Sequence, residues 1–112
     1  MWICLNNAFI SVVSKGEDKN KLCVRARRRE HLAALFPKAR IIEDGGTDYQ
    51  YRAFIGREEV ARVIGEALKN IDYDNFKSSV KDTTLHNGYS NVWGIMCDAL
   101  EENNNEEPVA KR

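Results

Sequence analysis

The stretch 22–35, LCVRARRREHLAAL, constrains the fold most because its apolar residues change period partway along. Residues 22–28 alternate as in a β-strand, and from Glu30 the apolar residues follow helical spacing. One face of the strand would hold Leu22, Val24 and Ala26. The opposite face would hold Cys23, Arg25, Arg27 and, if the strand continues, Arg29. We therefore predict a strand with a row of arginines on one face, followed by a short helix.

A first hairpin is predicted from the residues before this stretch. Residues 2–13 favour one long or bent strand, which Asn6 and Asn7 interrupt where a bulge or turn would fit. This segment is close enough in sequence to pair with residues 22–28 in an antiparallel hairpin. Pro37 ends the following helix because a proline pushes the residue before it out of helical geometry.

A second hairpin is predicted around the run DGGTD at 44–48, whose Gly-Gly centre is a good local signal for a turn. Its strands would cover residues 40–43 and 49–55. One face of the return strand would hold Tyr49, Tyr51, Ala53 and Ile55. The other face would hold Gln50, Arg52 and Phe54.

The rest of the chain predicts three helices. The first starts after Gly56 and carries a clear apolar stripe, formed by Val60, Val63, Ile64, Ala67, Leu68 and Ile71. A short helix is plausible over residues 75–80, and residues 82–84 can cap a final one. The buried stripe of that final helix would be Leu85, Tyr89, Val92, Trp93, Met96 and Leu100. Trp93 is thus expected in the core, whereas Trp2, at the end of an edge strand, is the better candidate for an exposed anchor.

This element order predicts one α+β domain over residues 1–100. It would be a four-stranded, mainly antiparallel sheet in ββαββα order, with helices on one face and an extra C-terminal helix. The other face would be at least partly open, as antiparallel sheets permit. Residues 101–112 are acidic, rich in Asn and without apolar period, so we expect a disordered tail there.

Charge is balanced in total but divided along the chain. Residues 1–40 hold nine basic and three acidic side chains, a net charge of +6, whereas residues 41–112 hold eight and fourteen, a net charge of −6. Such a dipolar molecule favours oriented docking onto a partner or a second copy of itself. The three cysteines are odd in number and widely spaced, which favours reduced thiols in a cytoplasmic protein. No segment resembles a targeting leader or approaches the roughly 20 apolar residues of a membrane helix.

The arginine row has two interpretations. Guanidinium groups could clamp phosphates, with aromatic side chains of the neighbouring strand stacking on a base. Alternatively, the arginines form cross-strand ion pairs with acids of the second hairpin, namely Glu43, Asp44 and Asp48. The candidate binding residues are Arg25, Arg27, Arg29, Tyr49, Tyr51 and Arg52.

No catalytic or metal-binding pattern stands out, so we expect neither enzyme activity nor a cofactor. His31 and His86 have no partner at metal-ligand spacing and are expected as ordinary surface or helix-start residues. Nothing marks any cysteine as activated. Asp72 and Asp74 could act as an acid/base or metal pair, but they could equally cap the short helix.

Four motifs together resemble a family of small uncharacterised proteins common in bacteria, phages and prophages. They are RARRREHL at 25–32, DYQYR at 48–52, IDYDNFK at 71–77 and LHNGYSNVW at 85–93. The resemblance covers roughly residues 1–100, and Gly56 departs from it where the family has a hydroxyl residue as helix cap. It implies a phage-associated context, in which short proteins without a cofactor often bind host proteins, as inhibitors of CRISPR and other host defences do.

The leading hypothesis from the sequence is therefore a non-enzymatic protein-binding module, for which the family resemblance implies inhibition of a host defence system. The alternative is a nucleic-acid or nucleotide binder that uses the arginine row on an open sheet face. A homodimer is also compatible with the dipolar charge and the open sheet.

Overall fold

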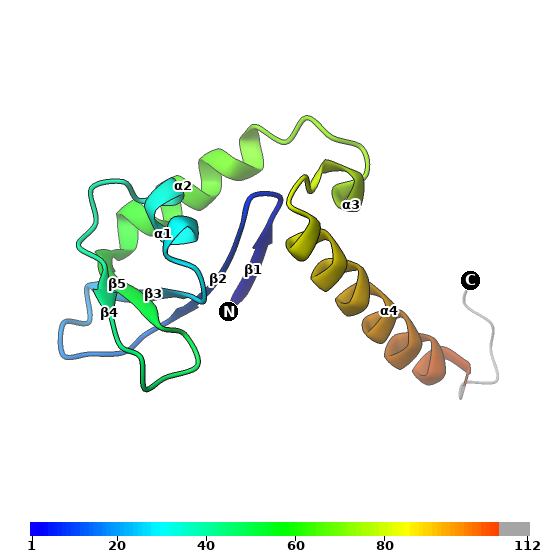
Figure 1. Ribbon diagram of the computed structural model, residues 1–112, viewed down its shortest axis with the longest axis horizontal. Helices are drawn as coiled ribbons and strands as arrows, with labels where there is room; N and C mark the ends of the chain where they lie inside the picture. The colour runs from blue at the N-terminus through cyan, green and yellow to red at the C-terminus, as the bar shows by residue number, and fades with distance from the viewer. Residues whose placement is uncertain (106–112) are drawn as a thin grey trace.

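The computed structural model describes residues 1–105 and, for residues 102–105, the backbone alone (Figure 1). Five strands form one sheet: β1 (Trp2–Leu5), β2 (Ala8–Val13), β3 (Lys21–Ala26), β4 (Ile42–Glu43) and β5 (Tyr51–Gly56). Four helices accompany them: α1 (Arg29–Leu35), α2 (Arg57–Lys69), α3 (Phe76–Ser79) and α4 (Thr83–Asn105). The strand order is β1-β2-β3-β5-β4, and every neighbouring pair is antiparallel. The α+β class and antiparallel pairing were predicted.

The sheet has five strands where the sequence predicted four. Residues 2–13 are two strands, β1 and β2, because Asn6 and Asn7 form a tight turn that folds one back on the other. Leu5 and Ala8 are partners directly across that turn. Asn is one of the residues that turns favour. The two asparagines within residues 2–13 therefore reverse the direction of the chain and do not merely bend one strand.

β3 is shorter than predicted, and this removes Arg29 from the arginine row. The strand ends at Ala26, Arg28 is still extended, and Arg29 is the first residue of α1. After the end of β3, a side chain of α1 bonds to β2 instead: the backbone N–H of Phe9 donates to Nδ1 of His31 at 3.3 Å. His31 thus lies in the first turn of α1, as the helix-start alternative predicted, but it is buried and not at the surface.

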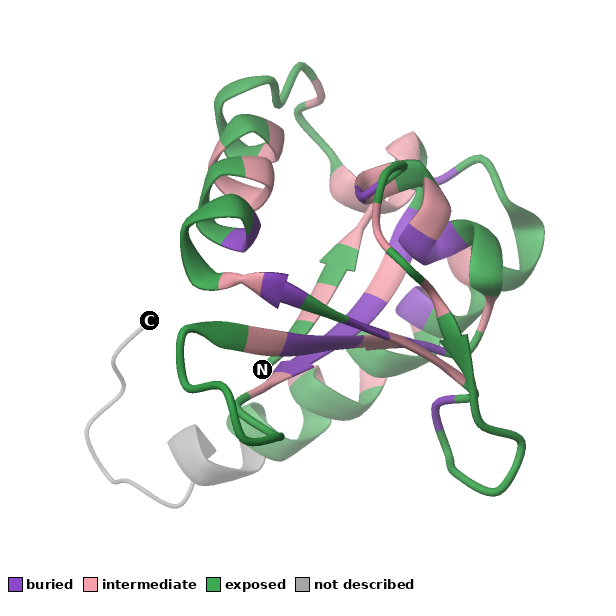
Figure 2. Cartoon of the chain, turned by 90° about the vertical axis from the view of Figure 1, so that its left-hand side faces the viewer, coloured by how far each residue is buried: buried purple, intermediate pink, exposed green. Residues whose placement is uncertain are grey.

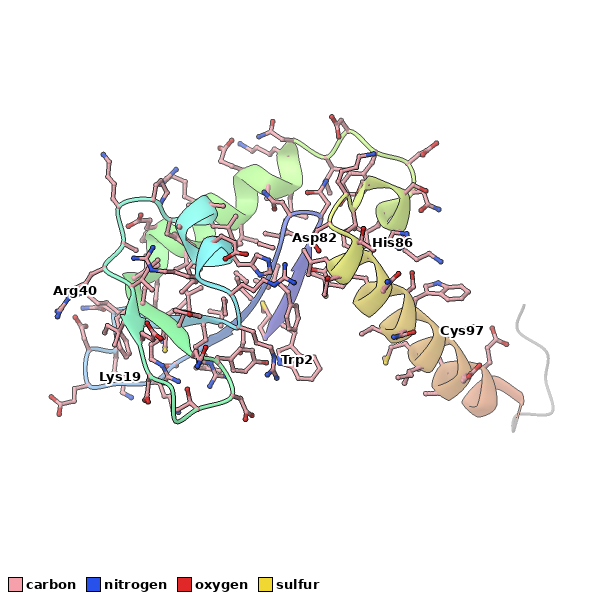
Figure 3. All side chains as sticks on the ribbon, in the orientation of Figure 1. Trp2, Lys19, Arg40, Asp82, His86 and Cys97 are labelled. Atoms are coloured by element: carbon pink, nitrogen blue, oxygen red, sulfur yellow. The ribbon has the colours of Figure 1, made fainter. Side chains whose placement is uncertain are left out.

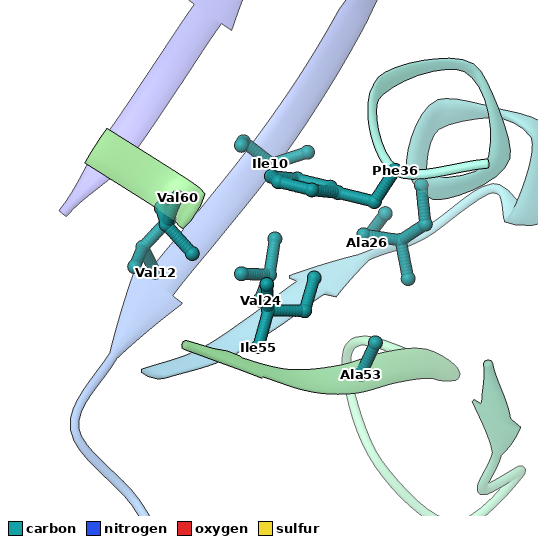
Figure 4. Packing of buried hydrophobic residues seen from close by; sticks show 9 residues of the cluster. Ile10, Val12, Val24, Ala26, Phe36, Ala53, Ile55 and Val60 are labelled. Atoms are coloured by element: carbon teal, nitrogen blue, oxygen red, sulfur yellow. The ribbon is translucent and has the colours of Figure 1, made fainter. Parts of the chain in front are cut away.

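The core lies between one face of the sheet and helices α1 and α2 (Figure 4). Alternate residues of the central strands point into it, including Val24 and Ala26 as predicted. Leu32 and Phe36 come from α1 and the residue after it, and Val60 comes from α2. Figure 2 shows this burial concentrated in the central strands.

Both long helices begin where the sequence predicted. α2 starts directly after Gly56, and Val60, Val63 and Ile64 pack on the core. Asp82 precedes α4, and its Oδ1 accepts the backbone N–H of Leu85 at 3.0 Å (Figure 3). An ion pair of 3.1 Å with Arg28 then ties this end of α4 to the segment between β3 and α1.

Beyond its first turns α4 leaves the rest of the molecule, so the predicted buried stripe is wrong for most of its length (Figure 1). Tyr89 is buried, and its hydroxyl lies 3.0 Å from each of the carbonyl oxygens of Leu5 and Ala8, to which it donates. After Tyr89 the residues of the stripe are about half exposed, and Lys77 of α3 lies over the ring of Trp93. α4 also continues to Asn105, five residues into the predicted tail, whereas residues 106–112 lie outside the described residues.

Among the described helices, none combines the length and the apolar character that crossing a membrane requires.

Candidate functional site

The sheet face opposite α1 and α2 carries a group of cationic side chains around one tyrosine. We call Arg25, Arg27, Arg52 and Tyr49 the arginine surface. Arg25 in β3 and Arg52 in β5 are register partners, so their side chains leave the sheet side by side on this face. The guanidinium carbons of Arg25 and Arg27 lie 4.6 and 4.8 Å from the centre of the Tyr49 ring.

Tyr49 reaches this surface because it precedes β5 instead of belonging to it. The strand starts at Tyr51, so the alternation of the sheet does not set the direction of Tyr49. The Thr47 hydroxyl donates to the carbonyl oxygen of Tyr49 at 2.8 Å, and Arg52 donates to the same oxygen at 3.2 Å. These contacts fold the loop before β5 over the arginines.

The arginine surface is not neutralised by the acids of the second hairpin. Arg25 donates to the Ser11 hydroxyl at 2.8 Å, and Arg27 donates to the backbone carbonyl of Asp48 at 3.2 Å. The predicted ion pairs with Glu43, Asp44 and Asp48 are absent from the described residues. The acceptors are neutral oxygens, and the Nε atoms of Arg25 and Arg52 are buried without a hydrogen-bond partner. Within the described residues these like charges therefore lie together without an ion pair to an acid.

One further residue of this face, Ser11, was not predicted from the sequence. Ser11 in β2 is fully buried opposite Arg25, which the alternation of β2 could have revealed. Lys15 is close enough to Cys23 to act on its charge, as are Arg52 and Arg25. Burial nevertheless raises the pKa of the Cys23 thiol, so this cysteine is not activated.

The structure separates two predicted site residues from the rest. Arg29 is exposed in the first turn of α1, and Tyr51 packs against the core on the other face of the sheet. Tyr49 does join the arginines, but it is only 7 % exposed. Since two guanidinium groups pack on its ring, neither it nor Tyr51 offers a free face to a nucleic-acid base.

A second feature is the uncovered part of α4. We call Val92, Trp93, Met96 and Leu100 the α4 stripe. Trp93 is 59 % exposed and Leu100 is 54 % exposed, in contrast to the core position predicted for Trp93. Lys77 of α3 places its Nζ 4.1 Å from the centre of the Trp93 ring. Trp2 is 73 % exposed, as predicted, and Phe54 of β5 is 40 % exposed (Figure 3).

A hollow of about 400 Å³ adjoins the first part of the α4 stripe. Its lining residues come from β1, α3, the segment before α3, and α4: Cys4, Asp74, Asn75, Phe76, Lys77, Tyr89, Val92 and Trp93. Burial raises the pKa of the Cys4 thiol and takes that of the Tyr89 hydroxyl well above its usual range. Neither group is therefore ionised near neutral pH.

The predicted acid pair does not cap α3. Asn75 does so instead, because its side-chain oxygen accepts the backbone N–H of Ser78 at 3.0 Å. Asp72 and Asp74 are exposed and line an open hollow of about 500 Å³. In the part of the chain that the structure describes, no three His, Cys, Asp or Glu side chains gather as a metal site would require.

Comparison of the chain with protein-family models, curated proteins and solved structures finds no match in any of the three. The resemblance to small phage and prophage proteins therefore stays a prediction.

Proposed function

We propose that the chain is a non-enzymatic module that docks on another protein through the arginine surface. The observation that carries this proposal is that three guanidinium groups share one sheet face and bond only neutral oxygens. An acidic partner surface would supply the missing counter-charge, and arginine offers carboxylates two parallel N–H donors. The partner chemistry is therefore a cluster of Asp and Glu side chains.

Keeping like charges together costs stability unless something binds them. Arg25 and Arg52 are direct cross-strand partners, so two positive charges lie side by side on this face. Natural proteins tolerate such unfavourable arrangements chiefly where function needs them. This argument supports a binding role over a structural one.

A protein partner is favoured over a nucleic acid by the state of the two tyrosines. Sequence-tolerant binding of single strands relies on aromatic rings that stack on bases, and Tyr49 and Tyr51 are both covered. Arginine and tryptophan are instead the side chains that dominate protein interfaces. The family resemblance supports a host protein as the partner, and a host defence component, such as one of a CRISPR system, as its class.

The test is capture of the partner from the native host, its purification, and measurement of its affinity for variant chains. The Arg25→Glu, Arg52→Glu double variant should weaken binding by about 100-fold, since each reversal places an acid against the partner's acids. Arg62→Glu, an exposed reversal on α2, is the matched control and should bind like the native chain.

The nucleic-acid alternative is tested with the same variants. Duplex and single-stranded DNA and RNA should bind weakly and without dependence on Arg25 or Arg52. Tight binding that falls steeply with salt and is lost in the double variant would establish phosphate contacts and overturn the protein-docking proposal. Unchanged affinity of the double variant for the purified protein would overturn it as well.

A further inference from the structure

We propose that two copies of the chain pair through α4, with the two helices antiparallel about a two-fold axis beside Met96. This inference rests on the α4 stripe and the adjoining hollow. It does not depend on the arginine surface.

The α4 stripe is a continuation of a face that is already in use. Tyr89 lies at the start of that face and is anchored on the turn between β1 and β2. Val92, Met96 and Leu100 follow at helical spacing and remain exposed. No charged residue interrupts this face from Leu85 to Leu100. A second apolar helix is the kind of surface that such a stripe fits.

The α4 stripe contains both a side chain that can insert into a neighbouring helix and a hole that can receive one. In a pair of packed helices, a side chain from one inserts into a hole made by residues i, i+3, i+4 and i+7 of the other. Tyr89, Val92, Trp93 and Met96 have this spacing and form such a hole. Three of the four line the hollow of about 400 Å³, so the hole is open and deepened by α3.

The spacing of the stripe makes it complementary to itself. Val92 lies four residues before Met96, and Leu100 lies four residues after it. An antiparallel pair with its axis at Met96 therefore sets Leu100 of each copy beside Val92 of the other, over the open hole. The exchange is reciprocal, as a two-fold interface requires. This self-complementarity identifies a second copy as the occupant.

Charge at the rim of the contact agrees with this pairing. Lys77 lies over the Trp93 ring at the edge of the hollow. Glu101 directly follows Leu100 and lies toward the same flank of α4 as Trp93, given 100° per residue. When Leu100 enters the hole, Glu101 of that copy comes to the side on which Lys77 of the other copy lies. The contact thus places opposite charges near each other at both ends.

The first measurement is sedimentation of the full chain over a range of concentrations. The native chain should pass from monomer to dimer, and Leu100→Glu should raise the dimer dissociation constant by about 100-fold because it would bury an unpaired charge. Asn87→Glu is the matched control. Asn87 is exposed and lies on the opposite side of α4 from Met96, so its variant should dimerise like the native chain.

A second measurement tests the axis directly. In a Cys4→Ser, Cys97→Ser background, Met96→Cys should form an intermolecular disulfide under mild oxidation, whereas Asn87→Cys should not. A native chain that stays monomeric at all concentrations would overturn the proposal. A dimer that Leu100→Glu leaves intact, or that Met96→Cys cannot cross-link, would overturn it too, because the interface would then lie elsewhere.

Discussion

The sheet and helices α1 and α2 bury their apolar side chains between them. The arm formed by α3 and α4 leaves most of its apolar side chains exposed. In the first region alternate residues of the central strands are sealed beneath α1 and α2, and Ile10 and Val24 are fully buried. In the second, a helix of 23 residues buries Tyr89 near its start and leaves the α4 stripe exposed. The first region covers its own apolar side chains, whereas the second leaves most of its apolar stripe exposed.

An apolar stripe predicts a helix, but it does not indicate which other element covers that stripe. α2 and α4 both carry apolar residues at helical spacing, and the stripe of α4 was predicted to be buried. α2 follows β5 without a loop, so its first turns lie on the sheet, although Leu68 at its far end is exposed. α4 is anchored near its beginning by Asp82 and Tyr89, Lys77 of α3 lies over Trp93, and the helix then projects beyond the sheet.

The sharpest contrast between the regions should appear on truncating one large side chain in each. Phe36→Ala should lower the free energy of unfolding by about 3–5 kcal/mol, because Phe36 is only 2 % exposed and its removal leaves a cavity. Trp93→Ala should lower it by less than about 1 kcal/mol in dilute solution, where the chain is monomeric. Urea unfolding of both variants gives the comparison. Equal losses would show that the stripe is part of the core.

Tyr89→Phe should weaken the contact that holds α4 on the turn between β1 and β2. This change removes the hydroxyl that donates to the carbonyl oxygens of Leu5 and Ala8 and should cost about 1–2 kcal/mol. Amide hydrogen exchange in α4 should accelerate more than exchange in α2. Equal acceleration in both helices would indicate that the arm and the sheet unfold as one unit.

The hydrogen bond between Phe9 and His31 should make the free energy of unfolding sensitive to mild acid. Burial lowers the pKa of His31 below its ordinary value of 6.5, and Nδ1 must be unprotonated to accept the N–H of Phe9. The unfolded chain therefore takes up the proton first. Stability should fall as pH drops from about 6.5 toward the folded-state pKa, with a slope of no more than one proton. His31→Gln should flatten this dependence, and an unchanged slope would assign it to another group.

The smallest effect concerns the arginine surface in the absence of a partner. Added salt should stabilise the native chain slightly, by less than about 1 kcal/mol, because it screens repulsion among the three arginines. Arg52→Met should reduce this salt effect, and Arg62→Met should not. Thermal unfolding at several salt concentrations measures it. Identical salt dependence in all three chains would mean that the charges are compensated within the chain.

Much of the sheet could be predicted because its signals are local. The alternation in β3 correctly placed Val24 and Ala26 in the core and Arg25 on the opposite face. The Gly-Gly turn and the helix start at Gly56 were also found from local patterns. These features depend on the chemistry of neighbouring residues, which a single sequence contains.

The candidate site could be predicted only in part. Arg25, Arg27 and Arg52 were identified, but the side on which Tyr49 lies depends on where β5 begins and on how Thr47 and Arg52 hold the loop. The exposure of the α4 stripe depends on the direction in which the helix leaves its anchor. Such features arise from tertiary contacts, and periodicity does not record them.

The most direct test of the central claim, that the arginine surface meets the partner, is the proton–nitrogen NMR spectrum of the arginine side chains as the purified partner is added. We predict that the Nε–H signals of Arg25, Arg27 and Arg52 shift or broaden, while that of Arg62 on α2 stays in place. Unchanged signals from all three, with the partner bound, would contradict the claim.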